Sequence, residues 1–264
     1  MHIKFKYSIL VAAITLLLFS GCEKVIDLKL KIASPQLVIE GNVTNQSAVH
    51  TVKISQSVPF TDSNKFPTVS GAVVTINDDR GNVYNLTETS PGTYSTPRFT
   101  GRTNYTYTLA VTVNGQTYTA TSVMPPFVRF DNLTYKESFF DSNKKVMTIH
   151  YQDPGNISNQ YHFVMYIDNV QIKNTILVNN DNFTNGRYVD DDLFQNDNDI
   201  LVGHAVTVEA QCIDNNIYTY LFSLREQLTG GPAPTPSNPP SNLSNNALGY
   251  FSAHTTQRLS ILIK

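Results

Sequence analysis

The stretch that decides the fold is YTYTLAVTV-NG-QTYTATSV, residues 105–123. In residues 105–113, tyrosine, leucine and valine alternate with threonine and alanine, which is the period-two pattern of a strand with one buried face. Asn114-Gly115 matches the two-residue type I′ turn that hairpins favour. Residues 116–123 then return as the second strand. We therefore expect an antiparallel hairpin here.

Similar short segments precede this hairpin at spacings of about ten residues. Strands are expected at residues 36–43, 49–55, 72–77 and 83–87. About seven short strands in some 90 residues are typical of an immunoglobulin-like β-sandwich, which we place at residues 35–124. Tyr105 or Tyr107 is a candidate for a tyrosine corner, and an ordinary place in the core is the alternative for both.

The sequence Met124-Pro125-Pro126 marks the expected boundary of a second domain, because proline cannot continue a central strand. Residues 125–264 form that domain, with strands expected at residues 130–136, 146–151, 161–168, 205–213, 248–251 and 258–263. Aliphatic residues recur at helical spacing after Asp214, which predicts one helix at residues 216–228. The proline-rich segment 232–240 is expected to be extended.

The fold class that we expect is therefore mostly β. It combines an N-terminal immunoglobulin-like β-sandwich with a second β-rich domain that carries one helix.

The N-terminus carries an export signal. A basic start is followed by an apolar run at residues 9–19, which is shorter than the roughly 20 residues of a membrane-spanning helix but fits a signal peptide. The run ends at Phe19-Ser20-Gly21-Cys22, which resembles the lipobox of bacterial lipoproteins. We predict a signal peptide at residues 1–21, lipid on Cys22 and a tether at residues 22–34. The alternative is a plain signal peptide followed by an unmodified cysteine.

The cysteine count and the charge agree with this prediction. With lipid on Cys22, the second cysteine, Cys212, has no partner, and its apolar surroundings predict a small buried hydrophobe rather than a nucleophile. Removing residues 1–21 takes away Lys4 and Lys6, which changes the formal net charge from −2 to −4. A weakly acidic chain without a basic patch does not indicate a nucleic-acid partner. The expected partner is a membrane, reached through the lipid.

Several segments occur together in a distinctive order: CEKVIDL at residues 22–28, LVIEG at 37–41, VSGAVV at 69–74, MPP at 124–126 and NALGYF at 246–251. The set resembles a Bacteroidetes lipoprotein family catalogued as domain of unknown function 4249, over essentially the whole mature chain. The resemblance implies an outer-membrane lipoprotein whose genes often lie beside TonB-dependent receptors, and hence an accessory of nutrient uptake. It supplies no substrate. Acidic residues after the lipidated cysteine promote surface display in this group. Here lysines are interspersed with Glu23 and Asp27, so the sequence does not decide between the periplasmic face and the cell-surface face of the membrane.

The sequence contains no recognised catalytic motif, so we expect no enzymatic activity and no cofactor apart from the lipid. His150 and His162 lie on strands expected to be neighbours and are candidates to meet, although structural roles are the alternative. The residues Asp190–Asp192 offer oxygen ligands of the kind that calcium prefers. Their spacing differs from that of an EF-hand, which favours a solvated loop within a long irregular stretch at residues 179–199.

Aromatic residues in polar loops are candidates for contact with a ligand or partner. They are Phe139, Phe140, Phe183, Tyr188 and Phe194. The alternative is that they pack against their own domain.

Three functions are compatible with these features. The first is a binding or accessory lipoprotein of a TonB-dependent outer-membrane uptake system. The second is a structural or adhesive surface lipoprotein, and the third is an enzyme with an unrecognised site.

Overall fold

The computed structural model describes residues 34–59, 65–139, 141–195, 199–228 and 238–264. Contacts divide the chain into a segment that ends at Ser34 and a compact unit, Pro35–Lys264, to which all of the following elements belong. Among the described residues, no helix is both long and apolar enough to cross a membrane. The predicted signal peptide, Cys22, nearly all of the tether and residues 232–237 of the proline-rich segment lie outside the described ranges.

The first group of strands forms two facing sheets. One contains β10 (Gln116–Val123), β9 (Thr106–Val113), β4 (Val73–Asp78) and β5 (Val83–Asn85) in that order. The other contains β1 (Leu37–Thr44), β3 (Thr51–Gln56), β7 (Thr93–Ser95) and β6 (Thr87–Ser90). A short ribbon joins β2 (Ser47–Ala48) to β8 (Phe99–Thr100). The expected hairpin is present, with Val113 paired to Gln116 and positive φ at Asn114 and Gly115.

The second group of strands also forms two layers. A three-stranded sheet contains β11 (Phe130–Glu137), β12 (Lys145–Gln152) and β16 (Tyr188–Leu193). Opposite it lie β13 (Gln160–Ile167), β14 (Val170–Gln171), β15 (Leu177–Asn180) and β17 (Ala205–Ile213).

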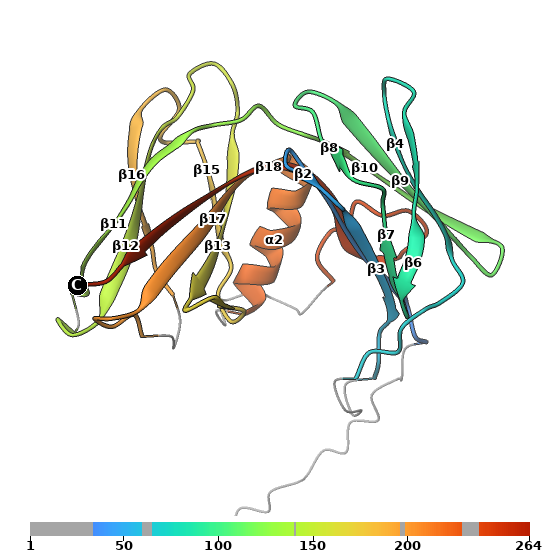
Figure 1. Cartoon of the computed structure of the whole chain (residues 1–264), viewed down its shortest axis with the longest axis horizontal. Coiled ribbons are helices and arrows are strands. Elements are labelled where there is room, and N and C mark those ends of the chain that lie inside the picture. The colour runs from blue at the N-terminus through green and yellow to red at the C-terminus, as the bar shows by residue number, and fades with distance from the viewer. Residues whose placement is uncertain (1–33, 60–64, 140, 196–198, 229–237) are drawn as a thin grey trace, which may run out of the picture. The chain divides into compact units, whose positions relative to one another are not determined.

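A single long strand, β18 (Leu248–Leu262), belongs to both groups. Its first half runs parallel to β1, from Val38↔Leu248 to Thr44↔His254, and its second half runs antiparallel to β17. The result is one nine-stranded sheet, ordered β14-β13-β17-β18-β1-β3-β7-β6 with β15 beside β13 (Figure 1). The expectation of two separate strands at residues 248–251 and 258–263 is therefore wrong. The division of the chain into domains at residue 125 stays a prediction.

Two hydrophobic cores lie on one face of this shared sheet. The first includes Ile39, Leu109 and Phe251, and the second includes Phe163 and Ile263. Phe251 of β18 enters the first core, and Leu259 and Ile261 of the same strand pack against the second, so β18 contributes to both cores. The mostly β fold class, with sandwich layers, is confirmed.

The tyrosine-corner question is decided by one hydrogen bond. The backbone N–H of Arg102 donates to the phenol oxygen of Tyr107 at 2.7 Å, and Tyr107 is buried. A bond from a buried tyrosine to backbone a few residues upstream is the defining contact of such a corner. Tyr107 therefore takes this role, while Tyr105 is only partly buried against the first core.

Helix α2 (Asn215–Leu228) lies against the opposite face of the shared sheet (Figure 1). It begins one residue before the expected start. Ile217 and Leu221 pack with Ile213 of β17 and Tyr250 of β18. Because Tyr250 and Phe251 are consecutive in a strand, they point to opposite faces. The helix and the two cores are therefore on opposite sides of β18.

Asp214 caps this helix, and we expect Asp214→Ala to lower the free energy of unfolding by about 1–2 kcal/mol. Its Oδ1 accepts the backbone N–H groups of Asn216 at 2.9 Å and Ile217 at 3.0 Å, and the Ser122 hydroxyl donates to its Oδ2. Urea denaturation measures the loss. Asp214→Asn keeps one acceptor oxygen and should lose less, so equal losses in the two variants would contradict the capping role.

Candidate functional site

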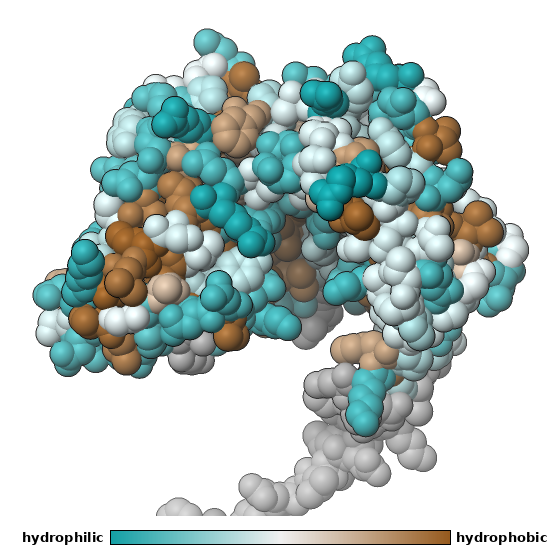
Figure 2. All heavy atoms as spheres, viewed as in Figure 1, coloured by the Kyte–Doolittle hydropathy of each residue, from teal (hydrophilic) through white to brown (hydrophobic). Residues whose placement is uncertain are grey.

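The four described members of the predicted aromatic contact set are all exposed. Phe139 and Phe183 are 96% and 87% exposed, Tyr188 begins β16, and Phe194 directly follows it. Phe140 lies outside the described residues. On the face drawn in Figure 2, hydrophilic residues predominate and hydrophobic side chains gather in several patches, the broadest at the left of the view. Of the four described aromatics, Phe194 lines a pocket, and a contact role for the set stays a prediction.

The residues Asp190–Asp192 lie in strand β16 and not in a loop, so the expectation of an irregular stretch at residues 179–199 is wrong there. The strand pairs with β12, from Met147↔Leu193 to Gln152↔Tyr188. Val189 and Leu193 enter the second core, which places Asp191 on the inner face and the other two aspartates on the outer face. In the described part of the chain, no group of three or more His, Cys, Asp or Glu residues is arranged to hold a metal ion.

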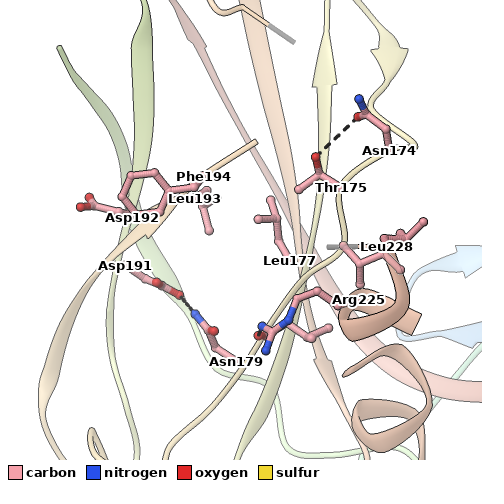
Figure 3. A pocket seen from close by; sticks show the side chains of 12 residues that line it. Asn174, Thr175, Leu177, Asn179, Asp191, Asp192, Leu193, Phe194, Arg225 and Leu228 are labelled. Carbon is pink, nitrogen blue, oxygen red and sulfur yellow. Dashed lines mark hydrogen bonds between the residues drawn. The ribbon is translucent and has the colours of Figure 1, made fainter. Parts of the chain in front are cut away.

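Asp191 lines a pocket of about 260 Å³ at the C-terminal end of α2 (Figure 3). The Asn179 side chain points toward Asp191 and donates a hydrogen bond to it. Burial raises the pKa of Asp191. Arg225 donates to the Val178 carbonyl at 3.0 Å, and its guanidinium lies 4.4 Å from the Phe222 ring centroid. The charged groups of this pocket are therefore engaged by their own chain.

The outer face of the three-stranded sheet carries a hydroxyl–imidazole–carboxylate row. Thr134 Oγ1 lies 2.6 Å from His150 Nε2, and His150 Nδ1 lies 2.6 Å from Asp190 Oδ1. This order occurs in catalytic triads. Here, however, the residues come from the outward positions of three adjacent strands, and the carboxylate of Asp190 is 66% exposed. The arrangement is that of cross-strand polar pairs on an open sheet.

His150 and His162 do not meet. β12 pairs with β11 and β16, whereas β13 pairs with β14, β15 and β17. The second core separates the two imidazoles, because the residues beside each histidine, Ile149 and Phe163, both point into that core. The idea of a shared His150–His162 site is wrong.

A larger cavity lies on the helix-bearing face of the shared sheet. It has a volume of about 520 Å³, within the usual range of small-molecule sites, and it is bordered by β1, β3, β13, β17, β18 and α2. We call it the sheet hollow. The polar residues that line it are Asn42, Thr44, Thr51, His162, Tyr166, Gln171, Glu209, Gln211, Tyr250, Ser252, His254 and Arg258.

Strand alternation places these residues. In β17, Val206, Val208 and Ala210 enter the core, so Glu209 and Gln211 point to the other face. The register places Glu209 beside Arg258. Although they face away from the cores, several lining residues are buried: Ser252 and His254 are 2% and 3% exposed.

A chain of hydrogen bonds fixes the polarity of the sheet hollow. Arg258 donates to Glu209 Oε2 through Nε at 2.8 Å and Nη2 at 2.6 Å, and Gln211 Nε2 donates to Glu209 Oε1 at 2.8 Å. The Gln211 oxygen therefore faces His162 Nδ1, 2.8 Å away. An amide oxygen only accepts, so His162 Nδ1 carries the proton and Nε2 is left as an acceptor.

Burial sets the charges of the sheet hollow. It lowers the pKa of His162, and it lowers the pKa of His254 to about 4. Burial alone would raise the pKa of Glu209, but the hydrogen bonds from Gln211 and Arg258 leave that pKa below its ordinary value. At pH 7 the lining thus holds one ion pair and two neutral imidazoles, which gives no net charge.

No local sequence pattern predicts this cavity. Its signal was present as polar residues at alternate positions of three separate strands, for example His162, Glu209 and His254. Only the strand register brings them together. The prediction for Cys212 is confirmed, because its thiol is buried and unpaired and burial raises its pKa.

Comparison with known proteins identifies the family. A family model described as Domain of unknown function (DUF4249) matches residues 23–260, nearly the whole chain after Cys22. None of the curated proteins matches the sequence. The resemblance drawn from the ordered motifs is confirmed, while the bacterial group and the membrane address stay predictions. The chain belongs to the DUF4249 family.

Proposed function

We propose that this protein is a lipid-anchored, non-enzymatic binding or accessory subunit of a TonB-dependent outer-membrane nutrient-uptake system. The observation that supports a binding role best is the sheet hollow, whose volume of about 520 Å³ suits a small molecule. Its walls come from paired strands of one sheet, which hold the lining side chains in fixed positions.

The sheet hollow contains unpaired polar atoms that a ligand could engage. Buried polar groups destabilise a protein unless they are hydrogen-bonded. The Nδ1 atoms of His162 and His254 have partners in Gln211 and Ser252. The described residues offer no hydrogen-bond partner to either Nε2 atom. Neither Nε2 is among the fully buried side-chain atoms without a partner, so both are open to a ligand in the sheet hollow.

The lipid on Cys22 would place this cavity at the outer membrane. Acyl chains stabilise membrane attachment by about 0.8 kcal/mol for each buried methylene, so two or more chains hold a protein firmly. A tethered binding protein raises the local concentration of nutrient and receptor for one another.

We expect Cys22→Ala to abolish lipid incorporation and membrane retention. Cells fed an alkyne-tagged palmitate analogue would label the wild-type protein, which would partition into the detergent phase, and neither result is expected for the variant. Cys212→Ala is the matched control, since its buried thiol should carry no lipid. Equal labelling of Cys22→Ala and the wild type would contradict the anchor.

The uptake role is tested by growth of a deletion strain on single nutrients. We expect slower growth on at least one limiting nutrient, restored by the wild-type gene and not by the Cys22→Ala gene. Unchanged growth across the panel, together with loss of surface attachment, would instead support the structural or adhesive alternative.

A further inference from the structure

The charges in the lining of the sheet hollow are balanced. The charged residues of its lining are Glu209 and Arg258, and they neutralise one another in a two-bond ion pair. An anionic ligand would meet Glu209 and a cationic ligand would meet Arg258. Either would have to compete with an intact ion pair, so the lining favours an uncharged ligand.

The open hydrogen-bonding atoms of the sheet hollow are of mixed kind. His162 Nε2 is an acceptor, because its Nδ1 donates to Gln211. Thr51 brings a hydroxyl, and Arg258 brings the guanidinium N–H groups that Glu209 does not take. A hydroxyl group can donate to the first and accept from the others, which a carbonyl or a carboxylate cannot do. Several hydroxyls on one ligand would suit this lining.

Apolar surface accompanies these polar groups. Tyr166 lines the sheet hollow with the Arg258 guanidinium 5.3 Å from its ring centroid, and Val164, Ile217 and Leu221 form further apolar wall. A ligand that carries C–H groups between its hydroxyls would contact both kinds of surface.

We infer that the sheet hollow binds an uncharged, hydroxyl-rich ligand of small saccharide size. This inference rests on the proposed function only in taking the sheet hollow as the ligand site. His162 accepts a ligand hydroxyl, and Tyr166 packs against the C–H surface of the ligand.

The test uses the full lipoprotein in mild detergent and a panel of neutral mono-, di- and trisaccharides, measured by calorimetry and thermal shift. The same sugars oxidised to uronic acids serve as charged counterparts. We expect at least one neutral sugar to bind, and its uronic acid to bind at least about tenfold more weakly. No binding across the neutral panel, or preference for the charged forms, would overturn the inference.

Single substitutions test whether the sugar binds in the sheet hollow. His162→Phe keeps a planar ring and removes the acceptor, and we expect it to weaken binding by about tenfold or more. His150→Phe makes the same chemical change on the far side of the second core and should bind like the wild type. Tyr166→Ala, at a partly buried position, provides a second reading should His162→Phe fail to fold. Unchanged binding by whichever of these two variants folds would overturn the assignment.

Failure of this inference differs from failure of the proposed function. A deletion strain that loses growth on a nutrient, with no neutral sugar bound by the protein, would overturn the ligand class and leave the uptake role standing. A bound neutral sugar whose utilisation does not change on deletion would uphold the ligand class and count against the uptake role.

Discussion

Gly249→Ala is expected to lower the free energy of unfolding by more than about 3 kcal/mol, which is the largest effect that we predict for one substitution. Gly249 has a φ of +94° at the start of β18. A Cβ atom there would lie 2.1 Å from the carbonyl oxygen of Ile39 and 2.9 Å from its carbonyl carbon. Both contacts are with backbone that is held in the β1–β18 ladder, so neither can be relieved by turning a side chain.

Gly115→Ala is the matched control for this experiment. Gly115 also has a positive φ, of +79°, but a Cβ at this position would meet nothing within 4 Å. The variant should therefore lose only about 1 kcal/mol of stability, which comes from the strain of alanine in a left-handed backbone conformation. Urea denaturation followed by circular dichroism compares the two. Similar losses in both variants would show that the contact with Ile39 is not what requires glycine.

Acidification from pH 7 to pH 4 is expected to remove stability on the order of 3 kcal/mol through His254 alone. Burial lowers its pKa to about 4, against 6.5 for an unperturbed histidine. Glu209 acts in the opposite direction, while His162 and His50 lower this pKa further. Between pH 6.5 and pH 4 the unfolded chain binds a proton that the folded chain does not. Stability therefore starts to fall as the pH drops below about 6.5, and this contribution is fully lost near pH 4.

Denaturation curves of the wild type and His254→Gln at several pH values isolate this contribution. Protonation of carboxylates also lowers the stability of the protein in acid. The measured quantity is therefore the difference in the free energy of unfolding between the two proteins. We expect the advantage of the wild type over His254→Gln to shrink as the pH falls from 7 to 4. A difference that stays constant over this range would contradict the assignment of a neutral, buried imidazole.

Local sequence pattern was sufficient where one face of an element is buried and the other is exposed. The hairpin at residues 105–123 and the helix capped by Asp214 were both predictable, because alternation, turn residues and capping act within a few positions. Asp214 also illustrates the limit. Its bond to Ser122 on β10 joins residues 92 positions apart, and no local pattern indicates it.

The strands β16 and β18 were not predictable in full for a different reason. Asp191 points inward in β16 and is held by Asn179, so a charged residue occupies a position where alternation demands an apolar one. In β18, His254 is buried by contacts on the helix-bearing face and not by the cores. Polar residues that are buried by distant elements look like loop residues in the sequence.

The candidate functional residues also fall into two groups, those in a contiguous motif and those brought together by strand pairing. Cys22 could be predicted as a lipidation site because the motif that resembles a lipobox is contiguous. The sheet hollow could not, because the bond between Glu209 and Arg258 depends on the register of β17 against β18. The polarity of His162 then depends on Gln211, which lies opposite it on β17. Both contacts depend on which strands pair and in which register, and a single sequence does not reveal either.

We propose that this protein serves a TonB-dependent receptor. The most direct test of this role is co-purification of a C-terminally tagged protein from native membranes solubilised in mild detergent, compared with an equally abundant, unrelated tagged lipoprotein. We expect a receptor of the TonB-dependent class to be enriched with this protein and not with the comparison lipoprotein. Recovery of this protein with no such receptor, at full yield and in several detergents, would contradict the proposed role.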